Sequence, residues 1–308
     1  MSLLTISIAS WNTKELTRQT IETIIKNTQM KDYEIIVIDN ASTDGSVDMI
    51  RECFPQVKVI QNKVNIGFGS AHNKVARASS GKYFCILNSD VIVLPGVFDK
   101  MVEFLETRKD YSVVTNKLLN VDMTLQESIA FFPVLWFEFI SRVPCVHYFY
   151  DVHKPFDHDK EQDIETFNGA CYIVRRSDFE KAGMFDESLF AYMEETDLFF
   201  RMKRLKMKIR YLPEVKIIHY GGASTASWAD KNIMYYTNLL QFFKKEYGDL
   251  TLFLVRLIVG FSNLLSISKY PVIKIIPDGR KKQLELREMD LALKLLKINM
   301  TKKIELNQ

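Results

Sequence analysis

The sequence has few cysteines: none of the four among its 308 residues forms a CxxC pair. Such sparse, scattered cysteines exclude a small domain held together by disulfides. The N-terminus also lacks a signal-peptide pattern, so we expect reduced thiols in a cytosolic compartment. No uninterrupted apolar run reaches the ~20 residues that a membrane-spanning helix needs. The nearest stretch, residues 250–267, is interrupted by Arg256, Ser262 and Asn263.

Net charge is also nearly absent, with 41 Lys and Arg against 38 Asp and Glu. This balance gives no support for a nucleic-acid partner. The charges are unevenly distributed, however, because residues 240–308 hold 13 basic against 7 acidic side chains. A basic, partly apolar tail after a mildly acidic body indicates a possible contact with an anionic membrane surface. The 47% hydrophobic content supports a full globular core.

Short β-branched runs alternate with helical patterns over the first 115 residues. We expect strands at 4–10, 34–38, 57–60, 83–87 and 112–115, and helices at 15–28, 46–54, 67–80 and 97–107. This alternation is typical of an α/β fold with a mostly parallel, doubly wound central sheet flanked by helices. Ligands of such sheets bind beyond the carboxyl ends of the strands, so the residues after each strand are the candidates for a site.

The second half is less regular. Residues 116–165 are rich in aromatics and interrupted by prolines, which is typical of an element that covers a substrate or docks on a surface. Strands at 170–175 and 208–212 and helices at 177–182 and 194–205 follow. The tail has helical patterns at 231–247, 250–266 and 280–299. We therefore divide the chain into an α/β domain, 1–230, and a C-terminal helical region, 231–308.

Polar residues follow the first two strands: Ser10, Trp11 and Asn12 after the first, and Asp39, Asn40, Ser42 and Asp44 after the second. Asp, Ser and Asn in such turns commonly cap helix N-termini. Alternatively, the carboxylates accept hydrogen bonds from a pyrimidine or a ribose while the indole forms an apolar wall. These turns alone leave the two interpretations equal.

Three further groups follow the later strands. Asn65, Gly67 and Asn73 surround a helix start suited to a phosphate, although the pattern is not GxGxxG. Asn88, Ser89 and Asp90 follow the fourth strand, where a carboxylate can hold Mg²⁺ or Mn²⁺; an ordinary Asx-turn is the alternative. His219 follows the last strand and can complete such a metal site.

An acidic cluster opens the predicted helix at 194–205, with Glu194, Glu195 and Asp197 inside four residues. The helix dipole favours acidic residues at that end, which is the ordinary explanation. The alternative is a general base, because mutual repulsion in a pocket raises the pKa of one carboxyl.

In their order, these motifs resemble the family 2 glycosyltransferases with the GT-A fold, over roughly residues 3–247. The resemblance rests on Trp11-Asn12, the run 37–46, the run 65–69, the run 87–90, Asn168-Gly169-Ala170, the acidic block 185–201 and His219. Within the family, the sequence is most similar to the rhamnosyltransferase-like branch that builds bacterial surface polysaccharides.

The resemblance implies a role for each motif. Asp39 binds the pyrimidine, Asp44 the ribose or phosphates, and Asp90, with Asn88 and His219, a divalent cation. Glu195 is the base, with Glu194 or Asp197 as alternatives. We place Asn168, Gly169 and Arg201 on the acceptor side. Two positions depart from the family pattern: Glu195 stands where the family usually has Asp, and Asn88 replaces an Asp.

The expected function is inverting transfer of a sugar, rhamnose-like by preference, from a dTDP- or UDP-sugar to a glycan or a polyprenyl-diphosphate-linked glycan. The alternatives are a catalytically silent nucleotide-sugar-binding module and, ranked lower, a sugar nucleotidyltransferase. We expect a cytoplasmic protein whose tail binds the inner face of the cell membrane or a second copy of the chain in a homodimer. The apolar stripe along 253–265, the basic residues Lys269, Lys274 and 280–282, and the aromatic segment 131–139 are the candidates for that contact.

Overall fold

The computed structural model describes residues 2–136, 138, 156–222, 231–268 and 279–300. The chain divides into two compact units, Met1–Phe132 with Phe156–Ser227, and Pro133–Pro155 with Trp228–Gln308. Every residue that we predicted for the site belongs to the first unit. Each unit is described separately below.

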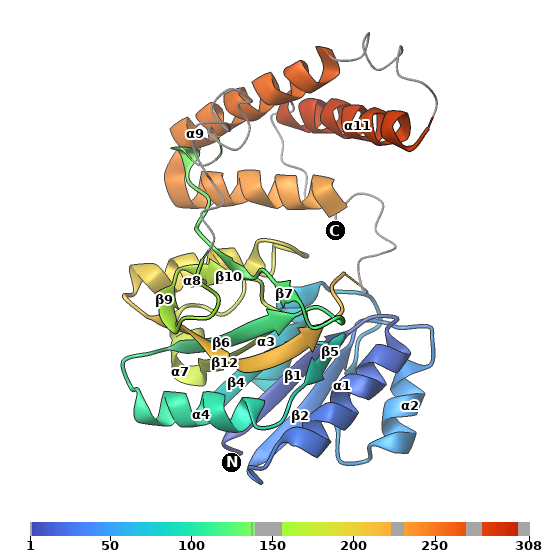
Figure 1. Cartoon of the computed structure of the whole chain (residues 1–308), viewed down its shortest axis with the longest axis vertical. Coiled ribbons are helices and arrows are strands. Elements are labelled where there is room, and N and C mark those ends of the chain that lie inside the picture. The colour runs from blue at the N-terminus through green and yellow to red at the C-terminus, as the bar shows by residue number, and fades with distance from the viewer. Residues whose placement is uncertain (1, 137, 139–155, 223–230, 269–278, 301–308) are drawn as a thin grey trace. The chain divides into compact units, whose positions relative to one another are not determined.

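The first unit is built on a mixed ten-stranded sheet with the main order β3-β2-β1-β4-β11-β6-β12-β5 (Figure 1). These strands are β1 (Leu4–Ser10), β2 (Tyr33–Asp39), β3 (Lys58–Gln61), β4 (Tyr83–Asn88), β5 (Val91–Val93), β6 (Val113–Leu119), β11 (Cys171–Arg175) and β12 (Ile209–His219). Two short strands extend it, β7 (Leu125–Gln126) beside β6 and β9 (Gln162–Ile164) beside β12. A separate pair joins β8 (Ile129–Ala130) to β10 (Thr166–Phe167).

Most of the central strands run in one direction. Strands β3, β2, β1 and β4 are parallel, and β6 is parallel to β12. Strand β11 lies antiparallel between β4 and β6. Two antiparallel pairings in succession bring β6 and β12 back to the direction of β4. The carboxyl ends of β1, β2, β3, β4 and β12 therefore share one edge of the sheet, as expected for this class of fold.

Helices cover both faces of the sheet. One apolar cluster joins the sheet to α1 (Lys14–Asn27), α2 (Ser46–Cys53) and α4 (Val97–Thr107). A second cluster, on the other face, joins it to α3 (Phe68–Ala78), α7 (Arg176–Lys181) and α8 (Glu194–Arg204). Strands β1, β2, β4 and β11 are largely buried on both faces because each is a near-continuous apolar run, and this burial is the main source of stability. The predicted α/β architecture is confirmed.

The structure differs from the sequence prediction where the apolar pattern is interrupted. Strand β12 was predicted to end at Leu212, because Pro213 and Glu214 break the run, yet it continues to His219 with a shift in register between Leu212 and Lys216. Proline cannot donate a ladder hydrogen bond, so it is accommodated at such an irregularity. The stretch predicted to be irregular contains the end of β6 and the short strands β7, β8 and β9.

The second unit contains α9 (Lys231–Ser268) and α11 (Arg280–Met300), which pack against each other (Figure 1). Gly248 interrupts α9 with a left-handed φ of 84° and an extended ψ of 178°, so the two helices predicted at 231–247 and 250–266 meet at this break. Glycine is needed there, because this combination of angles is essentially confined to glycine. Lys269, Lys274 and the aromatic positions 137 and 139 lie outside the described residues.

Candidate active site

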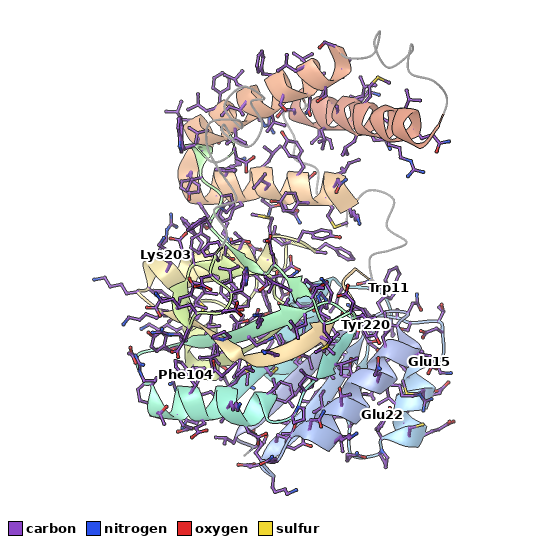
Figure 2. The ribbon with its side chains drawn as sticks, in the orientation of Figure 1. Trp11, Glu15, Glu22, Phe104, Lys203 and Tyr220 are labelled. Carbon is purple, nitrogen blue, oxygen red and sulfur yellow. The ribbon has the colours of Figure 1, made fainter. Side chains whose placement is uncertain are left out.

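The turns that follow parallel strands supply most of the predicted site. Trp11 follows β1, and Tyr220 follows β12 at the same edge (Figure 2). The backbone N–H of Tyr220 donates to the Asp90 carbonyl over 3.0 Å, so the end of β12 is joined to the turn after β4. The fold thus brings residues that are more than 100 positions apart in the sequence to one edge.

Asp39 is fully buried at the end of β2 and is only half satisfied. Its Oδ1 accepts the backbone N–H of Ser42 over 3.0 Å, but no described residue donates to its buried Oδ2. Neighbouring Asn40 accepts from Asn62 and donates to the Gly67 carbonyl, so its amide is committed to the fold. A buried carboxylate oxygen without a donor is costly unless a ligand supplies one. Asp39 is therefore the part of this turn best suited to a nucleotide base.

The turn after β1 is locked to the turn after β2. The backbone N–H of Asn12 donates to the Ser42 hydroxyl over 2.9 Å, and its Oδ1 accepts from the Thr43 backbone over 2.8 Å. Asn12 itself has a left-handed φ of 51°, which asparagine tolerates better than most residues. Asn12 and Ser42 thus join the two turns, and Trp11, in the first of them, is half-buried.

Asp44 caps two helices at once. Its Oδ2 accepts the Lys14 backbone N–H at the start of α1, and its Oδ1 accepts the Ser46 backbone and hydroxyl groups at the start of α2. Burial raises its pKa, but these hydrogen bonds outweigh that effect and hold the pKa below the usual value. Both of its carboxylate oxygens are in use, which favours the capping interpretation for this residue.

Ser10 and Ser89 belong to a buried cluster of hydroxyl groups beneath the edge. The Ser10 hydroxyl lies 3.0 Å from that of Thr17, and the Ser89 hydroxyl lies 2.9 Å from that of Thr13. The Thr20 hydroxyl donates to the Ser89 carbonyl over 3.0 Å. Both serines are 1% exposed, so they hold the turns together from below.

The helix start after β3 is shaped by a close backbone contact. Gly67 has a φ of 84°, and a Cβ there would lie 2.4 Å from the Phe190 carbonyl oxygen. Asn65 accepts the Gly67 backbone N–H over 3.0 Å. Glycine is thus required both by the left-handed φ and by the approach of the segment before α8.

Asn73, inside α3, fastens the same segment. Its amide nitrogen donates to the Phe185 carbonyl and to Glu187, and its Oδ1 accepts the Phe185 backbone N–H over 3.0 Å. This reciprocal pairing occupies the polar atoms of the Asn73 side chain. The amide orients the loop before α8, and in this structure it leaves no polar atom aimed at a nucleotide.

Asp90 and His219 form the most compact pair of candidate metal ligands. The His219 Nε2 lies 3.4 Å from the Asp90 Oδ1 and 3.2 Å from the Asn88 amide nitrogen. On its other side, the His219 Nδ1 lies 2.7 Å from the Gln126 Oε1. An amide oxygen can only accept, so Nδ1 donates to Gln126, and Nε2 is the ring nitrogen left for a metal. Gln126 comes from short strand β7, in the stretch without clear periodicity, and no sequence pattern indicated its role.

This donor set fits a hard divalent cation. Across the part of the chain that the structure describes, no three His, Cys, Asp or Glu side chains are grouped to hold a metal. Asp90 and His219 would supply two ligands, and reorientation of the Asn88 amide would present a third, neutral oxygen. Mg²⁺ in particular is usually held by one or two carboxylates together with substrate phosphates.

Glu194 and Glu195 start α8, and their environment suits proton transfer. Burial, then the charge of Glu195, raises the pKa of Glu194 well above its usual value, and no donor to its Oε2 is found within the described ranges. Burial also raises the pKa of the Glu195 carboxyl to about 7. A carboxyl that titrates near neutral pH is suited to general-base chemistry.

Gly169 lies in close contact with the Glu195 carboxyl. A Cβ at Gly169 would lie 2.1 Å from the Glu195 Oε1 and 2.7 Å from its Cδ. The adjacent Asn168 is exposed, and its backbone N–H donates to the Ser128 carbonyl over 2.7 Å. The Asn168-Gly169 segment therefore lies against the candidate base.

Asp197 and Arg201 are joined in a structural ion pair. The Asp197 Oδ2 lies 2.9 Å from the Arg201 Nε and 2.8 Å from an Arg201 terminal nitrogen. The guanidinium also donates to the carbonyls of Ala182 and Met184. These bonds fasten α8 to the end of α7, and they favour Glu195 over Asp197 as the proton acceptor.

Tyr172, on β11, was not predicted from the sequence. It is fully buried, packs against Phe167 and Phe199, and its hydroxyl lacks a partner among the residues described. Burial, and to a smaller extent the charges of Glu195 and Glu194, raise the pKa of Tyr172 well above its usual value. A tyrosine inside a β-strand reads as a core residue, so no sequence signal separated it from its neighbours.

The chain is similar in sequence to enzymes that act on sugars linked to polyprenol diphosphates. It is 25% identical over 211 residues to an N-acetylglucosaminyl-diphospho-decaprenol L-rhamnosyltransferase of Mycobacterium tuberculosis, covering 62% of this chain and 67% of that protein. It is 29% identical over 126 residues to the UDP-Glc:alpha-D-GlcNAc-diphosphoundecaprenol beta-1,3-glucosyltransferase of Escherichia coli, covering 41% and 50%.

A solved structure and a family model complete the comparison. A mannosyltransferase of Pyrobaculum calidifontis in complex with GDP-Man and Mn²⁺ superposes with a TM-score of 0.59 at 15% identity, covering 98% of this chain and 88% of that chain. This likeness confirms the GT-A type of fold. The sequence model described as glycosyl transferase family 2 matches residues 5–183, more than half of the chain. The chain belongs to the family 2 glycosyltransferases.

Proposed function

We propose that the chain transfers a sugar from a nucleotide-diphospho-sugar to a hydroxyl of a lipid-linked glycan, with inversion at the anomeric carbon. The names of the mycobacterial and Escherichia coli relatives both refer to diphospho-polyprenol-linked acceptors. The first of these favours a rhamnose-like donor, carried by dTDP or UDP. The reaction then takes place in the cytoplasm, at the inner face of the membrane, and contributes to a surface polysaccharide.

The observation that carries the proposal is the Glu195 carboxyl, whose pKa is raised to about 7 by burial and which lies against Gly169. In its ionised form, this group takes the proton of the acceptor hydroxyl. The hydroxyl oxygen then bonds to the anomeric carbon, while the bond from that carbon to the diphosphate oxygen breaks on the opposite face. The electron pair of the broken bond leaves with the nucleoside diphosphate.

Other residues of the edge bind and orient the donor. Asp39 would accept an N–H of the base through its buried Oδ2, to which no described residue donates. Asn12, Ser42 and Asp44 hold the turns around it in one geometry. Asn65 and Gly67 shape the backbone at the start of α3.

Asp90 and His219, with Asn88 beside them, would hold a divalent cation, Mg²⁺ or Mn²⁺. When bound, the ion would supply positive charge that stabilises the departing diphosphate. Gln126 would fix the His219 ring so that its Nε2 faces the ion.

The test of the base is the variant Glu195→Gln, which preserves side-chain size and removes the proton acceptor. We expect transfer to fall by about 10²–10⁴-fold, while affinity for the nucleotide-sugar stays within twofold. The matched control is Glu194→Gln, which should lose much less, because burial raises the pKa of the Glu194 carboxyl well above its usual value and so disfavours its ionised form. Wild-type turnover by Glu195→Gln would disprove the assignment.

The donor is identified by thermal-shift screening of dTDP-, UDP- and GDP-sugars with and without Mn²⁺, because a ligand that binds the folded state raises its apparent stability.

One specific observation favours a second function. Asn88 supplies a neutral amide at a position where the family usually has a charged Asp. This departure favours a nucleotide-sugar-binding module without catalysis. A donor that binds strongly in this screen without any transfer or hydrolysis in the presence of Mn²⁺ would favour that module.

A further inference from the structure

The second unit has an exposed apolar face that the catalytic residues do not explain. After the break at Gly248, α9 carries six large apolar side chains that are each between 36% and 74% exposed: Leu250, Phe253, Leu254, Leu257, Phe261 and Leu264. We call these six residues the outer face of α9. At about 100° per residue, they fall within an arc of roughly 100° on one side of the helix. An exposed apolar surface of this extent marks an interaction site.

The opposite side of the same helix is already covered. Leu252, Val255 and Val259 are buried there, and α11 packs against α9 with Ala292 and Leu295 buried. The Asn299 amide of α11 also donates to the Arg256 carbonyl over 2.6 Å. The outer face therefore cannot be satisfied by the helix hairpin itself.

The helix pair as a whole is amphipathic. On the side of α11 away from α9, Arg287, Asp290, Lys294 and Lys297 are charged, and Lys294 pairs with Asp290 over 3.2 Å. A spanning orientation would place these charges in hydrocarbon, where each is costly. An orientation parallel to the membrane plane, with the outer face down and α11 up, leaves them in water.

Composition identifies lipid as the occupant rather than another protein. An 18-residue window of α9 has a mean hydropathy of 2.0, so by length and composition alone this helix is apolar enough to cross a membrane. No Asp or Glu occurs between positions 250 and 268, and exposed Lys244 and Lys245 precede the break. Residues 240–308 hold 13 basic against 7 acidic side chains, which suits an anionic leaflet.

We propose that the outer face of α9 inserts into the surface of an anionic bilayer, so that the hairpin of α9 and α11 lies in the membrane plane. The role of this docking rests on the proposed function, because the reactive hydroxyl of a lipid-linked acceptor lies at the membrane surface. The docking itself needs neither donor nor acceptor and is measured without them.

The test is flotation of the full chain with vesicles of phosphatidylcholine, with and without phosphatidylglycerol. The variant Phe253→Ser, Leu257→Ser, Phe261→Ser removes the centre of the outer face, and we expect its partition onto vesicles to fall by about tenfold or more. The matched control is Val121→Ser, Met123→Ser, Leu205→Ser, which removes three other exposed apolar side chains and should float like the wild type. Circular dichroism should show that both variants remain folded.

Three outcomes would overturn the proposal. The first is equal flotation of the wild type and the outer-face variant. The second is a wild-type dimer in sedimentation that the variant converts to a monomer, without vesicle binding by either, since the face would then bind a second copy. The third is resistance of the membrane-bound chain to alkaline carbonate, because a surface-docked protein is released by it. Nucleotide-sugar affinity, which should be unchanged in the outer-face variant, separates failure of this proposal from failure of the proposed transferase.

Discussion

The contact between Gly169 and Glu195 makes a sharp prediction for the variant Gly169→Ala. The added methyl group would lie 2.1 Å from the Glu195 Oε1, and 2.7 Å from both Cδ and Cγ. Ordinary contacts between heavy atoms lie above 3 Å, so the carboxyl must retreat by about 1 Å or more. Gly169 is not among the glycines with a left-handed φ, so alanine fits the backbone itself without strain.

The expected consequence is a kinetic defect in a folded protein. Displacement of a catalytic group by about 1 Å costs on the order of 10²-fold in rate. We therefore expect kcat for sugar transfer to fall by about 10²-fold, with the nucleotide-sugar Kd within twofold of the wild type. Stability should change by no more than about 1 kcal/mol, since alanine also restricts the unfolded chain.

The assay combines steady-state transfer to a lipid-linked acceptor with calorimetric titration of the donor. The control is Gly279→Ala, because a Cβ at Gly279 meets nothing within 4 Å and should leave both measurements unchanged. A double-mutant cycle adds a second check. Glu195→Asp, which shortens the side chain by one methylene, should cost less in the Gly169→Ala background than in the wild type, since the two changes affect the same carboxyl.

An unchanged kcat in Gly169→Ala would refute the reasoning, because it would mean that the carboxyl beside Gly169 does not act on the acceptor. A loss of donor affinity equal to the loss of kcat would refute it differently, by indicating a general disturbance of the edge rather than displacement of the base.

Two further predictions separate neighbouring groups of the site. Asp39→Asn should weaken nucleotide binding by about tenfold or more in calorimetry, because a charged acceptor for the base is lost. Asp44→Asn should instead mainly lower the free energy of unfolding in urea, by about 0.5–2 kcal/mol, as expected for a lost helix cap. The reverse pattern would contradict both roles. The wild type should lose stability relative to Glu195→Gln as the pH rises from about 4.5 to about 7, by at most about 3 kcal/mol. Stability falls in this direction because the raised pKa makes the folded state bind the proton more tightly than the unfolded chain across that pH window. Urea unfolding at pH 5 and pH 8 measures the difference in unfolding free energy between the two proteins. A difference of the opposite sign would exclude a raised pKa for Glu195.

The sequence was sufficient for strands β1, β2, β3, β4 and β11, because each is a short run with apolar residues that is followed by a turn or a helix start. Parallel strands share a carboxyl edge, so Asp39, Asp90 and His219 could be assigned to one edge before any coordinates were known. The exact uses of the polar residues could not be predicted in the same way. Asp44 and Asn73 have the composition of ligands, but helix N–H groups and the Phe185 backbone occupy their polar atoms. Local sequence does not reveal which backbone groups need a partner.

Two residues of the site, Gln126 and Tyr172, were not predicted from the sequence for a different reason. Gln126 lies on a two-residue strand in a stretch with no periodicity, and its relation to His219 exists only after β7 pairs with β6. Tyr172 follows the ordinary pattern of a buried strand, and only the approach of α8 places its hydroxyl under the influence of Glu194 and Glu195. Contacts of this kind depend on tertiary packing between segments distant in the chain, which no window of sequence contains.

The same packing explains how two adjacent carboxyls acquire different protonation. Glu194 is 5% exposed and has an Oε2 without a donor among the described residues, whereas Glu195 is half-buried beside Gly169. Because like charges this close resist double ionisation, the pKa of the more deeply buried Glu194 is raised well above its usual value, whereas that of the more accessible Glu195 is raised only to about 7. A protonated Glu194 then removes the repulsion that would otherwise raise the pKa of Glu195 further. The pair therefore keeps an ionised base available at neutral pH in a site whose burial alone disfavours charge, and this division of roles requires the two glutamates to differ in depth, not in chemistry.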